Sequence, residues 1–306
     1  GSEANETAMK IARQYHLQHG KPGENRFKIL SRYRGYHGNT MGSMAATGQA
    51  ERKNGYEPGP AGFVHVMPPY PYRKHPKLTV QEHGEDMVHL MEETIIHEGY
   101  QTIAAILMEP MITGGGVLVP PDCYVPGIRK LCDKYGILLI FDEVQVGVGR
   151  SGRLWGYQKL GVEPDAFTLA KGLGGGFPIG ALCVKGSADH LQPGEHASTF
   201  GGNPMACRAG LTIAEQLSRR NLPAHAEAMG QLLLWWLALG WLGLERRRLW
   251  GLAIASLASV TVSIAAEING ILRSIPRLRR VLRIASLGST SDLAGTSKTS
   301  SKVRAS

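Results

Sequence analysis

Two polar residues directly follow apolar runs in the middle of the chain. The run at residues 137–141 is followed by Asp142, and the run at residues 166–170 is followed by Lys171. Short apolar runs closed by polar or Gly residues are typical of buried strands in a parallel sheet. Ligands of open α/β sheets bind outside the carboxyl ends of such strands, so one crevice can receive both side chains. A lysine amine can form a Schiff base, and a carboxylate can hold a pyridinium nitrogen protonated. Pyridoxal phosphate chemistry needs both groups.

Both residues also have ordinary structural interpretations. A Lys before a Gly-rich loop can be a solvated surface lysine, and an Asp at a strand end can cap the following helix. The blocks of sequence around Asp142 and Lys171 favour the chemical interpretation of the pair.

Three blocks carry a resemblance to a known family. They read FDEVQVGVGRSG from Phe141, TLAKGLGGGFPIGA from Thr168 and STFGGNP from Ser198. In this order and spacing they resemble the class III (ornithine/ω-amino acid type) pyridoxal-phosphate aminotransferases. The resemblance runs from Gly1 to about Leu217, with weaker echoes to about Leu234. It implies the α/β large domain of fold type I, with a mostly parallel central sheet and helices on both faces.

The resemblance also implies a reaction. Lys171 would carry the Schiff base with pyridoxal 5′-phosphate (the internal aldimine) and then act as general acid/base. Asp142 would contact the ring nitrogen. The expected function is transamination of an ω-amino acid or amine, with a 2-oxo acid as acceptor. Another class III activity, such as an aminomutase or racemase, and an inactive cofactor-binding fragment remain alternatives.

Further residues acquire cofactor-binding roles only through the resemblance. Tyr36 would stack on one face of the ring and Val144 would pack against the other. Gln145 would hydrogen-bond the ring hydroxyl oxygen. His37, which follows Tyr36, either belongs to this cofactor site or is a packed core histidine.

The phosphate would lie at the start of the chain. A Gly1-Ser2 turn that feeds a helix N-terminus is a ready anion site, and Ser2 is expected to be the N-cap. By resemblance, Gly1 and Ser2 hold the phosphate. Thr199 would reach the phosphate of the neighbouring subunit, which implies a homodimer.

The donor is expected to be an amine or ω-amino acid, with pyruvate as acceptor. Ornithine- and GABA-type members of the family carry a second Glu at the position of Gly114, which lies in Glu109-Pro110-Met111-Ile112-Thr113-Gly114. The present form resembles taurine, β-alanine or diamine–pyruvate enzymes more closely.

Apolar periodicity predicts the elements that position these residues. Expected strands cover residues 27–30, 63–66, 103–108, 137–141, 166–170 and 179–184, the last antiparallel by resemblance; expected helices cover residues 81–97, 124–135 and 205–217, with a further helix through Ala8, Ile11, Ala12 and Tyr15.

Charge and cysteine content restrict the class of protein. The net charge of +9 belongs to residues 218–306, which hold 13 basic and 4 acidic residues, whereas residues 1–217 hold 21 of each. The charge of residues 1–217 therefore does not indicate a nucleic-acid-binding surface. The four cysteines show no metal-ligand spacing, so we expect no metal, reduced thiols and a cytoplasmic enzyme.

The two parts of the chain differ in character. Residues 1–217 are expected to form the cofactor-binding large domain, N-terminally incomplete, and residues 218–306 a divergent Leu/Trp/Arg/Ser-rich tail in place of the family's small domain. Residues 249–266 carry no charge, which on hydropathy alone makes them a minimal membrane-span candidate. A reading-frame change near Leu234, a membrane anchor and an unusual helical domain all remain open, and the frame change is favoured over the anchor.

Overall fold

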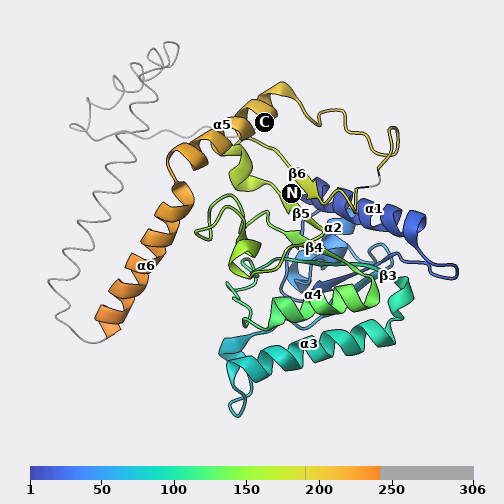
Figure 1. The fold of residues 1–306 in the computed structure, drawn as a ribbon, viewed down its shortest axis with the longest axis horizontal. Coiled ribbons are helices and arrows are strands. Elements are labelled where there is room, and N and C mark those ends of the chain that lie inside the picture. The colour runs from blue at the N-terminus through green and yellow to red at the C-terminus, as the bar shows by residue number, and fades with distance from the viewer. Residues whose placement is uncertain (190, 242–306) are drawn as a thin grey trace, which may run out of the picture. The chain divides into compact units, whose positions relative to one another are not determined.

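The computed structural model describes residues 1–189 and 191–241, and its sheet lies in the unit Gly1–Gln231 (Figure 1). The helices are α1 (Ser2–His19), α2 (Met41–Ala46), α3 (Val80–His97), α4 (Tyr124–Tyr135), α5 (Pro204–Arg219) and α6 (Leu222–Trp241). The strands are β1 (Lys28–Arg32), β2 (Phe63–Val66), β3 (Ile103–Met108), β4 (Leu138–Asp142), β5 (Ala166–Leu169) and β6 (Ala181–Val184). Single 3-10 turns are η1 (Ala50–Arg52), η2 (Pro71–Arg73), η3 (Tyr100–Thr102), η4 (Gly156–Lys159) and η5 (Lys171–Gly174).

The six strands form one sheet in the order β2-β1-β3-β4-β5-β6. Strands β1 to β5 run parallel to one another, and β6 runs antiparallel to β5. The predicted α/β class and mostly parallel sheet are therefore confirmed. In the register between β4 and β5, Asp142 lies opposite Thr168.

Helices cover both faces of the sheet, as Figure 1 shows. One apolar cluster joins the sheet to α3 and α4, and a second joins it to α1 and α2. Leu139 and Phe141 of β4 belong to the first cluster, whereas Leu138 and Ile140 belong to the second. Because side chains alternate along a strand, the next residue, Asp142, points to the α1 face.

The observed boundaries differ slightly from the predicted ones. Strand β4 begins one residue later than expected and includes Asp142, and β6 begins two residues later. Helix α5 starts at Pro204 because Asn203 caps it: the Ala206 amide donates to Asn203 Oδ1 at 2.9 Å.

Helix α3 buries only part of its apolar surface. Met91 and Ile95 are buried, but Leu90 is 39% exposed. A helix that lies on another layer buries only a stripe of its surface, and Leu90 lies outside that stripe.

Several predictions from the sequence concern residues after Trp241. Residues 249–266, the possible membrane span, and most of the predicted tail lie outside the described residues. Within residues 1–189 and 191–241, the helices are too short or too polar to cross a membrane. The proposed domain boundary after Leu217 stays a prediction.

Candidate functional site

A cavity of about 1670 Å³ opens at the carboxyl ends of β4 and β5. It is lined by the first residues of α1, by the segments that follow β1, β4 and β5, and by the loop before α5. The lining includes every residue predicted from the sequence to be catalytic or cofactor-binding, namely Gly1, Ser2, Tyr36, His37, Asp142, Val144, Gln145, Lys171 and Thr199. The fold thus brings together residues that are up to 198 positions apart in the sequence.

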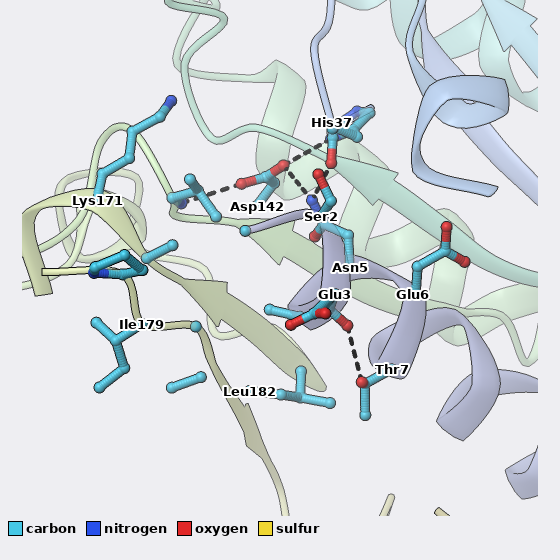
Figure 2. A pocket seen from close by; sticks show the side chains of 18 of the residues that line it. Ser2, Glu3, Asn5, Glu6, Thr7, His37, Asp142, Lys171, Ile179 and Leu182 are labelled. Atoms are coloured by element: carbon cyan, nitrogen blue, oxygen red, sulfur yellow. Dashed lines mark hydrogen bonds and ion pairs between the residues drawn. The ribbon is translucent and has the colours of Figure 1, made fainter. Parts of the chain in front are cut away.

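Asp142 is a buried carboxylate that lines this cavity. It is 3% exposed, and its Oδ2 accepts hydrogen bonds from Asn5 Nδ2 and His37 Nδ1, each at 2.8 Å. Its Oδ1 accepts from the Val144 amide at 3.0 Å. Figure 2 shows these interactions as dashed lines around Asp142. A carboxylate with three donors has a fixed orientation, which suits contact with one ligand atom.

His37 is buried, and both its backbone and its ring form hydrogen bonds. It is 2% exposed, and its backbone amide donates to Thr47 Oγ1 at 2.9 Å. Its ring Nδ1 faces a carboxylate oxygen, which can only accept, so we assign the proton to Nδ1. Among the described residues its Nε2 has no hydrogen-bond partner. His37 is therefore tied to the site by its hydrogen bond to Asp142.

Lys171 begins η5, and Ala170 alone separates it from the end of β5. Its φ of +44° lies in the left-handed region, which is costly for a residue with a side chain and is often found at functional sites. The ammonium group donates a hydrogen bond to Gln145 Oε1. The side chain is exposed to the cavity, so its amine is accessible to a ligand.

The start of α1 differs from the prediction, because Ser2 is not the N-cap. Gly1 occupies the cap position without a side-chain cap, and Ser2 is the first helical residue. From that position the Ser2 hydroxyl points away from the helix backbone, where it donates to Asn39 Oδ1 at 3.0 Å and accepts from the Asn39 amide at 3.1 Å. The first turn of α1 lines the cavity, and the positive end of its helix dipole suits an anion.

The residues expected to hold a flat ring lie at the same cavity. Tyr36 is half-buried and Val144 is half-buried, and both line the space between α1 and η5. The Tyr36 amide donates to Glu109 Oε1 at 3.1 Å. The other Glu109 oxygen, Oε2, accepts from the Thr113 amide and hydroxyl, each at 3.0 Å. Buried Glu109 thus joins the segment of Tyr36 to the turn after β3.

Thr199 lies in an exposed loop that is tied to α1. Gln14 Nε2 donates to Glu195 Oε1 at 2.8 Å, and Lys10 Nζ lies 3.1 Å from His196 Nδ1. These contacts hold the loop beside the cavity. They do not test whether Thr199 reaches a second subunit.

Sequence reasoning missed three polar residues that support the site: Asn5, Glu109 and Thr168. Asn5 carried a usable signal, since it precedes Ala8 by three residues and Ala12 by seven on the apolar side of α1. A polar residue on such a face needs a buried partner. Thr168 carried no such signal, because a Thr in a buried strand is ordinary.

The residues present fit pyridoxal 5′-phosphate. A buried carboxylate, an accessible lysine amine, an aromatic ring and a helix N-terminus all border one cavity. Each matches one part of that cofactor: ring nitrogen, aldehyde, ring face and phosphate. In the described part of the chain, no group of His, Cys, Asp and Glu side chains could hold a metal ion.

Comparison with known proteins points to one family. The Aminotransferase class-III family matches residues 1–239. An acetylornithine aminotransferase of Parasynechococcus marenigrum (strain WH8102) is 47% identical over 235 residues, which cover 76% of this chain and 51% of that protein. An uncharacterized aminotransferase of Bacillus subtilis (strain 168) is 44% identical over 245 residues, with coverage of 76% and 53%.

Solved structures agree with this match. An (S)-enantioselective omega-transaminase from Thermomicrobium roseum has a TM-score of 0.73 at 44% identity, with coverage of 78% of this chain and 54% of that one. An amine transaminase from an uncultivated Pseudomonas species, in its PLP-bound form, has a TM-score of 0.73 at 38% identity, with coverage of 78% and 55%. The chain therefore spans about half the length of the relatives it matches.

Proposed function

Since this chain belongs to the class III aminotransferases, we propose that it supplies the cofactor-binding half of a pyridoxal 5′-phosphate-dependent transaminase. The observation that carries the proposal is that the Lys171 amine and the Asp142 carboxylate border the same cavity from the ends of adjacent strands. The family's cofactor is pyridoxal 5′-phosphate, and one neighbouring structure contains it.

Each part of the cavity has a separate task in this proposal. Asp142 holds the proton on the ring nitrogen, and the amide donors around it keep its carboxylate in place. Tyr36 and Val144 would hold the two faces of the ring, and Gln145 would bind the ring hydroxyl oxygen. When bound, the cofactor supplies an electron sink for charge that develops on the substrate carbon.

The remaining tasks fall to the start of α1 and to η5. Gly1 and Ser2 would hold the phosphate, because the helix N-terminus favours negative charge. Lys171 would hold the cofactor covalently through its side-chain amine, and the same amine, when free, would serve as the base and acid that moves a proton to and from the substrate carbon.

We further infer an ω-amino acid or amine as donor and a 2-oxo acid, pyruvate, as acceptor. Gly114 supports this, since it lines the cavity where other family members carry an acid. A Cβ at Gly114 would lie 3.5 Å from Gln49 Nε2 and 4.0 Å from Tyr36 Cβ, so the site has room for a side chain but carries none. The related proteins include both acetylornithine aminotransferases and omega-transaminases. A donor screen on an intact homologue with this Gly that ranks acetylornithine with 2-oxoglutarate first would refute the assignment.

A homodimer and a cytoplasmic location complete the proposal. Thr199 and the 80% exposed Phe200 lie in an exposed loop that lines the cavity, so a second subunit can contact them. All four cysteines are free thiols, as in proteins of reducing compartments. Light scattering on the purified chain with cofactor checks the dimer, and cell fractionation checks the location.

Covalent labelling tests the central assignment. The full chain is mixed with pyridoxal 5′-phosphate, its absorbance spectrum is recorded before and after an amine is added, and the complex is reduced with borohydride and mapped by peptide mass spectrometry. The pyridoxyl group is expected on Lys171, and Lys171→Ala should lose it. A label on Lys159 or Lys185, the neighbouring lysines in the sequence, would contradict the proposal.

A further inference from the structure

Thr168 is a buried polar residue that does not line the cavity. It is 0% exposed and lies opposite Asp142 in the parallel register of β4 and β5. Both side chains therefore project to the same face of the sheet, where α1 packs. A Val would fill nearly the same volume without the cost of desolvating a hydroxyl, so the Thr168 hydroxyl calls for an explanation.

The hydroxyl of Thr168 holds the oxygen end of the Asn5 side-chain amide. Thr168 Oγ1 donates to Asn5 Oδ1 at 2.8 Å. The opposite end of the amide, Nδ2, then donates to Asp142 Oδ2 at 2.8 Å and to the His37 carbonyl at 2.7 Å. Asn5 is 1% exposed, so water cannot replace these partners. Figure 2 shows Asn5 between Asp142 and the His37 backbone.

We propose that Thr168 and Asn5 are positioning residues that hold the Asp142 carboxylate against the ring nitrogen of the cofactor. This inference rests on the proposed function, in which Asp142 contacts that nitrogen. Without the Thr168 hydroxyl, the buried Asn5 oxygen has no donor, and the Asn5 side chain is held only by the bonds of its NH₂ group to Asp142 and to the His37 carbonyl. The NH₂ group is then fixed less tightly against Asp142 Oδ2, whose other side-chain donor is His37.

A pair of cofactors separates this role from a general effect on folding. 1-Deazapyridoxal 5′-phosphate has a C–H group in place of the ring nitrogen and is otherwise the same shape, so only pyridoxal 5′-phosphate can use the aligned carboxylate. The equilibrium affinity of the full chain for each is measured by titration. We expect Thr168→Val to weaken pyridoxal 5′-phosphate by about three- to tenfold, the range of one lost hydrogen bond, and to leave the deaza analogue unchanged.

Matched variants make the test specific. Thr168→Ser keeps the hydroxyl and should bind both cofactors like the wild type. Thr102→Val removes a part-buried hydroxyl that donates to the Glu98 and Gly99 carbonyls just before β3, at the opposite end of the sheet, and should change neither affinity. Asn5→Ala should reproduce the selective loss. The double variant Asn5→Ala/Thr168→Val should lose no more than Asn5→Ala, because Thr168 acts through Asn5.

Several results would overturn the inference. Equal losses for both cofactors in Thr168→Val would show a merely structural role, and additive losses in the double variant would show that Thr168 does not act through Asn5. Weak binding of pyridoxal 5′-phosphate by Thr168→Ser would also contradict the inference, because this variant keeps the hydroxyl. If Asp142→Ala also leaves the ratio of the two affinities unchanged, the contact between Asp142 and the ring nitrogen is absent, and the proposed function falls with the inference. If only Asp142→Ala changes that ratio, the inference alone fails.

Discussion

At the scale of single residues, the Asp142 carboxylate accepts more hydrogen bonds than an amide could. Its Oδ2 faces two donors, from Asn5 and His37, and its Oδ1 faces a third, from the Val144 amide. An asparagine has one acceptor oxygen and one NH₂ group. Whichever way an asparagine is turned, its NH₂ group meets at least one donor in a buried environment.

We therefore predict two effects of Asp142→Asn. Without cofactor, the free energy of unfolding should fall by about 1–3 kcal/mol, because a buried donor loses its acceptor. In an intact homologue, proton transfer should slow by about two to four decades, because a neutral amide no longer holds the ring protonated. Urea unfolding and half-reaction rates measure the two effects.

The control for this prediction is Asp122→Asn, which changes an exposed carboxylate and should alter stability by less than about 0.5 kcal/mol. Near-normal half-reaction rates for the variant at Asp142 would contradict its assigned role. Unchanged unfolding would contradict the hydrogen-bond argument.

Gly38 is a second residue on which the site depends. Its φ is +138°, and a Cβ there would lie 2.4 Å from Ser2 Oγ and 2.8 Å from Ser43 Cβ. We expect Gly38→Ala to lower the free energy of unfolding by about 1–3 kcal/mol and to weaken cofactor binding, because Ser2 must move away from Asn39.

The control is Gly186→Ala. Its Cβ would enter open space, so this variant should be as stable as the wild type. Thermal unfolding with and without pyridoxal 5′-phosphate compares them; equal stability of the two variants would refute the packing argument.

At the scale of elements, Glu143 joins the end of β4 to η4. It is fully buried, and its two carboxylate oxygens accept from the Gly156 amide at 2.8 Å and the Tyr157 amide at 2.7 Å. Burial raises the pKa of Glu143 to about 7; the two amide donors oppose this increase, and the nearby Asp142 charge adds to it. The segment that carries Val144 and Gln145 lies between these anchor points.

This pKa predicts how stability depends on pH. An unfolded Glu releases its proton near pH 4.5, whereas folded Glu143 keeps its proton up to about pH 7. Between these values the folded state binds more protons, so the contribution of Glu143 to stability falls as the pH rises, by up to about 3 kcal/mol in total. It is fully present below pH 4.5 and lost above pH 7.

Urea unfolding at several pH values between 5 and 8 tests this prediction. Glu143→Gln cannot titrate, so the difference in unfolding free energy between wild type and variant should shrink as the pH rises. Glu51→Gln, at an exposed carboxylate, should leave the pH slope unchanged. Parallel pH profiles for wild type and Glu143→Gln would show that Glu143 does not titrate in this range.

At the scale of the whole molecule, the chain carries about half of a class III enzyme. The family matches residues 1–239, and the relatives are nearly twice as long as the segment they share with this chain. Turnover needs the substrate to be held in a fixed orientation against the cofactor. By resemblance, the family's small domain supplies part of that hold.

We predict that this chain binds cofactor but turns over amine slowly or not at all. A chimera in which residues 235–306 are replaced by a regular class III small domain should gain activity and stay monodisperse. Amine turnover and size-exclusion chromatography compare the two proteins. Should the original chain match the chimera in rate and remain monodisperse, residues 235–306 form a working domain and the prediction is wrong.

Much of the fold and many of the site residues were accessible from the sequence. The apolar runs before Asp142 and Lys171 predicted parallel strands, and the structure has β4 and β5 there, in one sheet. The short blocks around these residues indicated the family, which the comparisons confirm. These signals are local, since each depends on neighbouring residue types and on the period of an element.

The supporting contacts were not accessible in the same way. Asn5 and Asp142 are 137 positions apart, and Asn5 and Thr168 are 163 apart. No period along the chain relates these positions. The prediction that Ser2 is the N-cap of α1 was wrong for a similar reason. The helix already includes Ser2, and the Ser2 hydroxyl binds Asn39, a residue distant in the sequence, instead of capping the helix.

The sequence by itself determined the chemistry: an amine on Lys171, a carboxylate on Asp142, and the strands that carry them to one edge of a sheet. Only the tertiary structure decided how that carboxylate is held. The β4–β5 register sets Asp142 opposite Thr168, and the packing of α1 on that face places Asn5 between them. The reason is physical, because a shift of one residue in a strand turns its side chains to the opposite face, and register depends on how whole layers pack.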